Sequence, residues 1–252
     1  MFYVGIDIGS TASKVCILEN DEITDTFVLP TGWSSVKTSE EIKERLEELG
    51  INVSNSKVVA TGYGRVSVPY ADKTLTEITC HGKGAYYLFG KDCTIIDIGG
   101  QDTKVITVQN GNVTNFTMND KCAAGTGRFL ELMANTLGLD ITELCRMAKE
   151  GKETTISSMC TVFAESEVIS LIGKGKKRED IAYGVVDSIT SKVKTLCQKH
   201  SDSFGYFLTG GLSENDYIIE KLSEKLGTTV KTSPLGRYAG AIGAAIMAKG
   251  VR

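Results

Sequence analysis

Residues 7–15 read DIGSTASKV, and residues 97–105 read DIGGQDTKV. The two stretches share Asp, Ile, Gly, Lys and Val in register. Each joins two apolar, β-type runs and continues through a hairpin dipeptide, Asn20-Asp21 or Asn110-Gly111, into a third run. Helical patterns follow both copies. A duplicated meander of strands followed by helices predicts an α/β fold with two similar lobes that face each other.

The first copy has the composition of a phosphate-binding loop. Asp7 stands at the end of a strand, and the small residues after it let backbone N–H groups approach a phosphate. The hydroxyls of Ser10 and Thr11 add hydrogen-bonding groups. Asp7 is then expected to hold Mg²⁺ through water, because this ion keeps much of its hydration shell.

The second copy repeats this chemistry on the facing lobe. Gly99 and Gly100 form the turn after Asp97, and Gln101 is placed to orient a water for attack on a terminal phosphoryl group. A single Asp-Ile-Gly stretch is more often a strand that ends in a turn. Two copies in register argue against that interpretation.

A third glycine-rich site lies at residues 207–215, where a β-type run leads into Thr209-Gly210-Gly211. Backbone without side chains can lie flat against a base or a ribose. This signal is weak by itself, since paired glycines are common where loops begin. Together with the two phosphate loops it predicts a nucleotide cleft with ATP as the ligand.

Helical patterns and charge complete the outline of the chain. The helical segments are residues 39–49, 126–137, 180–197, 216–226 and 239–248. The last is apolar nearly all round, so it is expected to be buried between other elements. We expect one lobe of residues 1–92, completed by the terminal helix of residues 240–252, and a second lobe of residues 93–239.

Composition narrows the class of protein. The formal net charge of −3 gives no electrostatic reason to expect nucleic acid or an anionic membrane as a partner. An acidic residue within the first apolar run argues against a signal peptide. No apolar run approaches the ~20 residues that a membrane helix needs. The expected location is the cytoplasm.

Two of the seven cysteines have an unusual setting. No pair has C-x-x-C spacing, and a free cysteine in a reducing compartment is by default a small buried hydrophobic residue. Cys122 and Cys160, however, each follow a polar pair, Asn119-Asp120 or Ser157-Ser158, and open a small-residue or helical segment. A helix N-terminus favours a thiolate. Two thiolates are half the set for a four-iron cluster, and a symmetric dimer would supply the other half.

The remaining five cysteines and His200 are interpreted as structural residues. Cys80 and His81 are adjacent and would point in divergent directions on a helix, which argues against joint metal binding. No role is assigned to His81. His200 is expected at the surface near a helix end. The cysteines interpreted as structural are Cys16, Cys80, Cys93, Cys145 and Cys197.

The motifs together resemble a known family. Two phosphate loops, an adenosine loop and a small-residue terminal helix are similar to the superfamily of actin, heat-shock chaperones and sugar kinases. More closely, the chain resembles the BadF/BadG/BcrA/BcrD ATPase family, the activators of 2-hydroxyacyl-CoA dehydratases. The resemblance runs nearly end to end, and its most specific motifs are NDKCAAGTGRF at 119–129 and SSMCTVFAESE at 157–167. It also rests on residues 7–14, 60–65, 77–82, 96–102 and 232–235.

The resemblance implies a two-lobed actin-like ATPase fold, built from duplicated ribonuclease H-like domains, with the nucleotide in the inter-lobe cleft. It implies ATP or ADP, Mg²⁺ and one [4Fe–4S] cluster per homodimer, with Cys122 and Cys160 as its ligands. The expected activity is ATP-driven transfer of single low-potential electrons to a 2-hydroxyacyl-CoA dehydratase or a related iron–sulfur reductase. Ferredoxin or flavodoxin is the expected electron donor. The expected catalytic residues are Asp7, Asp97 and Gln101. The expected nucleotide-binding residues are Gly9, Ser10, Thr11, Ala12, Ser13, Lys14, Gly99, Gly100, Gly125, Gly210, Gly211, Asn215 and Arg237.

Some features leave alternatives open. Members of the family often carry Gln where this chain has Arg237, whose guanidinium could stack on an adenine ring instead of bonding its edge. The basic run at residues 174–178 is interpreted as a solvated charge run, with docking of an acidic partner as the second interpretation. The alternative function is a sugar or amino-sugar kinase of the same fold, with Asp102 as the base. That alternative offers no reason for the settings of Cys122 and Cys160, and a filament-forming actin-like protein ranks third.

Overall fold

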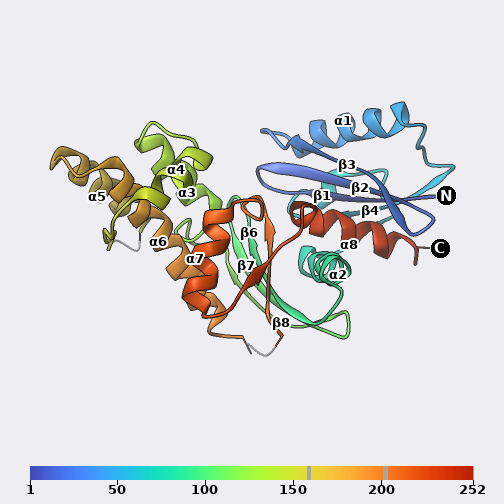
Figure 1. Ribbon diagram of the computed structural model, residues 1–252. Coiled ribbons are helices and arrows are strands. Elements are labelled where there is room, and N and C mark those ends of the chain that lie inside the picture. The colour runs from blue at the N-terminus through green and yellow to red at the C-terminus, as the bar shows by residue number, and fades with distance from the viewer. Residues whose placement is uncertain (158–159, 201–203, 252) are drawn as a thin grey trace. The chain divides into compact units, whose positions relative to one another are not determined.

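The computed structural model describes residues 1–157, 160–200 and 204–251 (Figure 1). It contains two five-stranded sheets, and the chain divides into two compact units. The first unit comprises Met1–Cys93, Ile106–Asn115 and Leu235–Arg252, and the second comprises Thr94–Val105 and Phe116–Pro234. The predicted α/β fold is confirmed. The lobe limits predicted from the sequence stay a prediction.

The first sheet has the strand order β3-β2-β1-β4-β5. Its strands are β1 (Phe2–Ile8), β2 (Ala12–Glu19), β3 (Glu22–Pro30), β4 (Ser56–Thr61) and β5 (Lys73–Thr74). β1 pairs antiparallel with β2, which sets Asp7 opposite Lys14, and parallel with β4, which sets Asp7 opposite Thr61. The strand–turn–strand prediction for the first repeat is therefore confirmed.

Helices cover both faces of the first sheet because alternate side chains on its strands are apolar on both sides. The helices are α1 (Ser35–Glu48), α2 (Glu77–Phe89) and α8 (Ala239–Ala248), with short 3₁₀ turns η1 (Arg65–Ser67) and η2 (Gly236–Tyr238). Val15 and Ile17 pack in the cluster that contains Ile42 of α1, whereas Cys16 and Leu18 pack with α8. Figure 1 shows α1 on one face and α2 with α8 on the other.

Glycines let α8 approach its neighbours with backbone against backbone. A Cβ atom at Gly5 of β1 would overlap the carbonyl oxygen of Ala241, and one at Gly243 would overlap the carbonyl oxygen of Cys80 in α2. The expected burial of the terminal helix is thus confirmed, since most of α8 is buried. The chain uses small residues here because no side chain fits between the two backbones.

Substitution of Gly243 is expected to destabilise the fold strongly. Overpacking a core commonly costs about 1–3 kcal/mol, and here the added methyl meets backbone that cannot move aside, so Gly243→Ala should lower the unfolding free energy by about 3 kcal/mol. Chemical denaturation measures this change in the unfolding free energy. The matched control is Gly250→Ala, whose added Cβ would lie 3.6 Å from the Met247 carbonyl oxygen, an ordinary contact. Equal stability of both variants would contradict this explanation of the helix packing.

The second sheet repeats the first, with the order β10-β9-β6-β7-β8. Its strands are β6 (Cys93–Ile98), β7 (Thr103–Gln109), β8 (Asn112–Asn119), β9 (Tyr206–Gly210) and β10 (Val230–Lys231). β6 pairs parallel with β9, and Asp97 lies opposite Thr209. Each sheet therefore has a three-strand meander, a parallel fourth strand and a short fifth one, which confirms the internal repeat.

The second unit carries the longer run of helices. These are α3 (Gly127–Thr136), α4 (Ile141–Glu150), α5 (Thr161–Gly173), α6 (Arg178–Cys197) and α7 (Asp216–Leu226). One apolar cluster joins residues of α3, α4, α6 and α7 to β6, β7 and β9. The core of this unit therefore lies between the sheet and these helices.

Two local predictions need correction. The first predicted helix was capped by Ser39, but α1 begins at Ser35 because the Ser34 side chain accepts the N–H of Lys37 and so caps the helix earlier. His200 was expected at the surface. It is buried, and its Nε2 forms a 3.0 Å hydrogen bond with the Thr117 hydroxyl. Desolvation lowers the pKa of this imidazole, which favours its neutral form.

The hairpin dipeptides behave as predicted. Asn20 and Asp21 have φ of 50° and 71°, and Asn110 and Gly111 have φ of 49° and 71°. These left-handed values match the twist of the two adjoining strands.

Within the described part of the chain, no helix has the length and apolar character needed to cross a membrane.

Candidate functional site

The first phosphate loop is held in shape by Thr31. Its hydroxyl donates to the carbonyl oxygen of Gly9 at 2.8 Å and lies 2.8 Å from the buried Ser13 hydroxyl. Its backbone N–H donates to the carbonyl oxygen of Thr11 at 3.0 Å. Ser13 is therefore bonded within the loop, and its role as a nucleotide ligand stays a prediction. Thr31 was missed because it lies on the neighbouring segment, outside the repeated motif.

Asp7 is buried and lies against bare backbone. Gly62 follows β4 with a left-handed φ of 86°, and a Cβ there would overlap Asp7 Oδ1. A Cβ at Gly240 would lie 2.6 Å from Asp7 Oδ2 and 3.4 Å from His81 Nδ1. The carboxylate and the imidazole of His81 therefore converge beside Gly240. Neither of these two glycines was predicted to belong to the site.

The second unit presents the same arrangement around Asp97. Thr209 donates its hydroxyl to Asp97 Oδ1 at 3.2 Å, and a Cβ at Gly210, whose φ is 85°, would lie 2.7 Å from that oxygen. A Thr-Gly pair thus ends the parallel neighbouring strand beside each aspartate, Thr61-Gly62 beside Asp7 and Thr209-Gly210 beside Asp97. The internal repeat therefore extends to a part of the site that the repeated motif does not include.

Lys104 is a buried cation within the second loop. Its ammonium group lies 2.8 Å from the Asp102 carboxylate and 3.5 Å from that of Asp97. An ammonium buried this deeply needs such partners to offset its lost hydration. The two ion pairs of Lys104 therefore fix the positions of the Asp97 and Asp102 carboxylates at the entrance of the loop.

The other predicted site residues, catalytic Gln101 among them, differ in exposure and in hydrogen bonding. Thr11, Gln101 and Gly211 are exposed. Asn215 caps α7, where its side chain accepts the N–H of Ile218 at 3.1 Å, so one of its polar atoms is already used. In the first unit lie Gly9, Ser10, Thr11, Ala12, Ser13, Lys14 and Arg237, and in the second lie Gly99, Gly100, Gly125, Gly210, Gly211 and Asn215.

The second phosphate loop is bonded directly to the start of α3. The carbonyl oxygens of Gly99 and Gly100 accept the N–H groups of Gly127 and Arg128 at 2.9 and 2.8 Å. The buried Thr103 hydroxyl donates to the carbonyl oxygen of Gly125 at 2.6 Å. A displacement of this loop would therefore be transmitted to the segment that carries Cys122.

Cys122 is exposed in the loop between β8 and α3. It is followed by the predicted small-residue segment, and α3 (Gly127–Thr136) begins within one residue of the predicted helix start at residue 126. α3 begins at Gly127, since Gly125 has a left-handed φ of 92° that no helix can accommodate. Instead, the side-chain amide of Asn119 holds the loop by donating to the carbonyl oxygens of Cys122 and Ala124, at 2.9 and 3.0 Å.

Cys160 is exposed at the N-cap of α5, as its sequence setting predicted. Its carbonyl oxygen accepts the N–H of Ala164 at 2.9 Å. Ser158 and Met159, which belong to the motif around this cysteine, lie outside the described residues. Cys160 therefore lies beside the backbone N–H groups of the first turn of α5.

The other five cysteines are buried, as predicted. Burial raises the pKa of Cys16, Cys93 and Cys197 to about 12. It raises the pKa of Cys80 and Cys145 to about 11. Thiols in this state are neither nucleophiles nor metal ligands. Only Cys122 and Cys160 combine accessibility with positions on loops, which fits the chemistry of a thiolate-bound cluster.

This contrast predicts the outcome of thiol labelling. In native protein freed of metal, iodoacetamide at about pH 8 should alkylate two of the seven cysteines rapidly, because the remaining five are inaccessible and stay protonated. Mass spectrometry of peptides should assign the rapid sites to Cys122 and Cys160. All seven should react after denaturation. Rapid native labelling of any buried cysteine would contradict the assignment.

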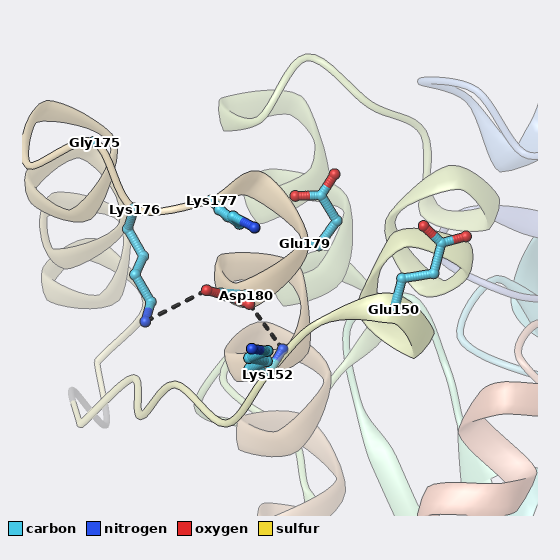
Figure 2. Close-up of a pocket in the computed structure, with 7 residues that line it drawn as sticks. All are labelled: Glu150, Lys152, Gly175, Lys176, Lys177, Glu179 and Asp180. Carbon is cyan, nitrogen blue, oxygen red and sulfur yellow. Dashed lines mark hydrogen bonds and ion pairs between the residues drawn. The ribbon is translucent and has the colours of Figure 1, made fainter.

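A hollow in the second unit lies among mixed charges (Figure 2). Asp180 is its centre: it accepts the N–H of Lys152 at 2.8 Å and lies 3.4 Å from the ammonium of Lys176. The basic run of residues 174–178 is therefore partly paired with an acidic residue. None of the predicted site residues lines this hollow, whose lining consists of Glu150, Lys152, Gly175, Lys176, Lys177, Glu179 and Asp180.

The repeated loops and the paired exposed cysteines define an ATPase of a particular family. The chain belongs to the BadF/BadG/BcrA/BcrD ATPase family, whose model matches residues 4–248. It is 45% identical to the (R)-2-hydroxyglutaryl-CoA dehydratase activating ATPase of Acidaminococcus fermentans, over 98% of this chain and 97% of the relative.

Two solved structures of dehydratase components are also similar to this chain over nearly its whole length. The crystal structure of component A of the Acidaminococcus fermentans (R)-2-hydroxyglutaryl-CoA dehydratase has a TM-score of 0.94 at 44% identity and covers 100% of this chain and 99% of that one. The activator of the 2-hydroxyisocaproyl-CoA dehydratase from Clostridium difficile, with bound ADPNP, has a TM-score of 0.90 at 39% identity and covers 98% and 94%.

A ROK family glucokinase from Streptomyces griseus resembles the chain with a TM-score of 0.61 at 14% identity, covering 99% of this chain and 100% of the kinase. This likeness concerns the fold alone. It confirms that the two duplicated sheets form an actin-like ATPase fold.

Proposed function

We propose that this protein is an ATP-dependent activator that delivers single low-potential electrons to a 2-hydroxyacyl-CoA dehydratase or a related iron–sulfur reductase. The observation that carries the proposal is the separation of the cysteines: two are exposed on loops, and five are buried. The relatives named as dehydratase activators support the same interpretation. The electron would reach the protein from a ferredoxin or flavodoxin.

The nucleotide would be ATP with Mg²⁺. Asp7 and Asp97 are buried carboxylates at the ends of equivalent strands, and each would bind water of the ion's hydration shell. The backbone N–H groups of the loops after them would bind phosphate oxygens. The exposed Gln101 would orient the attacking water. Arg237 would contact the adenine.

Cys122 and Cys160 from each of two copies would give the four thiolates of one [4Fe–4S] cluster. When bound, this cluster supplies one-electron redox chemistry. The protein's own contribution is to place the two thiolates: the Cys122 carbonyl is held by Asn119, and Cys160 caps α5. The N–H groups in the first turn of α5 would favour negative charge there.

The hydrogen bonds between the second phosphate loop and α3 would couple the two functions. The carbonyl oxygens of Gly99 and Gly100 and the hydroxyl of Thr103 connect the phosphate loop to residues 125–128, next to Cys122. Lowering a one-electron potential by about 0.3 V requires about 7 kcal/mol, at about 1.4 kcal/mol per 59 mV. Nucleotide turnover supplies free energy of that order, whereas a change in one surface contact does not.

The kinase alternative is not favoured. Its base would be Asp102, but that carboxylate lies 2.8 Å from the Lys104 ammonium. The carboxylate is therefore already engaged by the buried ammonium group and is not free to accept a hydrogen bond from a sugar hydroxyl with the same geometry. The kinase interpretation also leaves the exposed cysteines without a purpose.

Electron delivery should depend on ATP hydrolysis and on the Thr103 bond. Dithionite-reduced protein is mixed with purified dehydratase, first the Acidaminococcus fermentans enzyme, and reduction is followed by electron paramagnetic resonance. MgATP should support transfer and ADPNP should not. Thr103→Val should slow transfer about 10-fold, the effect of about 1.4 kcal/mol, because it removes the bond to Gly125.

The matched control for Thr103 is Thr190→Val. The buried Thr190 hydroxyl also donates to a backbone carbonyl, that of Val186 at 2.8 Å, but within α6 and away from the phosphate loop. It should transfer electrons at the wild-type rate. Equal transfer with and without nucleotide would refute ATP-driven delivery.

A further inference from the structure

Close in sequence to each exposed cysteine, a polar side chain bonds to the neighbouring backbone, and neither of these side chains was predicted to be functional. The loop of Cys122 is held by Asn119, the last residue of β8. Ser157, three residues before Cys160, is held by Glu167 of α5.

Asn119 acts through its amide nitrogen. This nitrogen donates to the carbonyl oxygens of both Cys122 and Ala124, at 2.9 and 3.0 Å. An amide NH₂ has two donors, and both are used on a single turn. Because the acceptors lie on either side of the Cys122–Ala124 peptide segment, the bonds fix the backbone from which the thiol projects.

Glu167 acts through both carboxylate oxygens. They accept the backbone N–H of Ser157 at 3.1 Å each and lie 3.1 and 3.3 Å from the Ser157 hydroxyl. Ser157 stands three residues before Cys160, and Glu167 stands two turns further along the helix that Cys160 caps. The approaching chain is therefore tied to the helix on which the cysteine sits.

We infer that Asn119 and Glu167 are positioning residues that preorganise Cys122 and Cys160 as cluster ligands, an inference that rests on the proposed function. Neither side chain would touch iron. They would hold the two thiolates at the separation that one cluster requires, so that little ordering is left when it binds. Groups that orient metal ligands in this way typically contribute 10–100-fold to metal affinity.

The test measures how fast a chelator removes iron from anaerobically purified protein, followed by the visible absorbance of the cluster. Asn119→Asp keeps the shape but cannot donate, and Glu167→Ala removes the acceptors. Each should speed iron loss about 10-fold relative to wild type. Glu167→Gln keeps one oxygen to accept the Ser157 N–H and should stay within about threefold.

Matched controls separate positioning from general damage. Asn115→Asp makes the same change at an exposed position of the same strand, and Glu150→Ala removes an exposed carboxylate of α4. Both should lose iron at the wild-type rate. Hydrogen exchange of the metal-free variants gives a second readout: residues 120–125 should exchange faster in Asn119→Asp only, and residues 152–157 in Glu167→Ala only.

The outcomes distinguish the two claims. Iron loss at control rates in both variants, with unchanged hydrogen exchange, would overturn the positioning role and leave the proposed function intact. Wild-type protein that holds no iron would overturn the proposed function and this inference with it. Fast loss in Glu167→Ala without recovery in Glu167→Gln would also count against positioning, because the conservative variant keeps the essential acceptor.

Discussion

Replacing Cys122 by Ser is expected to yield colourless protein with almost no iron, against a brown wild type. An alcohol does not ionise near neutral pH and cannot replace a thiolate as a cluster ligand. In a symmetric dimer each replacement removes two of the four ligands, so the loss should be nearly complete. Cys160→Ser should behave identically. The measurement is iron and acid-labile sulfide per chain after purification without oxygen.

The control for this pair is Cys145→Ala. Cys145 is buried in α4, and burial raises the pKa of its thiol to about 11, so it is no ligand in the wild type. The variant should keep its colour and full iron content, with some loss of stability from the small cavity. A Cys122→Ser protein with a complete iron complement and an unchanged visible spectrum would disprove the ligand assignment.

Replacing Asp97 by Asn should reduce Mg²⁺-dependent ATP hydrolysis by about 100-fold. The amide is neutral and cannot attract the water shell of the ion as the carboxylate does, and groups at this distance from a metal typically contribute 10–100-fold. The fold should survive, because Lys104 keeps its closer partner Asp102 at 2.8 Å. Asp7→Asn should give a loss of the same size, since Asp7 occupies the equivalent strand end.

Phosphate release at saturating MgATP measures this effect. Asp216→Asn is the matched control: it removes an exposed carboxylate at the start of α7 in the same unit and should hydrolyse ATP at the wild-type rate. Wild-type hydrolysis by Asp97→Asn would show that the strand-end aspartates do not serve the metal ion.

The sequence repeat was sufficient to predict the fold, because the first three strands of each sheet and the turns between them lie within one continuous segment. Asp7 and Lys14 are seven positions apart and face each other in the sheet. By contrast, Gly62 lies beside Asp7 only through the parallel pairing of β1 with β4. No local pattern shows which distant Thr-Gly pair ends the neighbouring strand, so this part of the site needed three-dimensional structure.

The cysteine site was predictable to a similar degree. Neighbouring polar residues and the family resemblance separated Cys122 and Cys160 from the other five, and their exposure agrees with that separation. The start of α3 was also predictable: the predicted helix of residues 126–137 matches Gly127–Thr136, and the left-handed Gly125 separates it from the loop of Cys122. The bonds of Asn119 and Glu167 depend on side-chain direction and loop path, which residue spacing does not define.

The central claim is that two copies of this chain share one iron–sulfur cluster through Cys122 and Cys160. Purification without oxygen, followed by size measurement and iron and sulfide analysis of the same fraction, tests it most directly. We expect a brown dimer with about four irons and four sulfides, the content of one [4Fe–4S] cluster. Colourless, iron-free protein that phosphorylates an added sugar would contradict it.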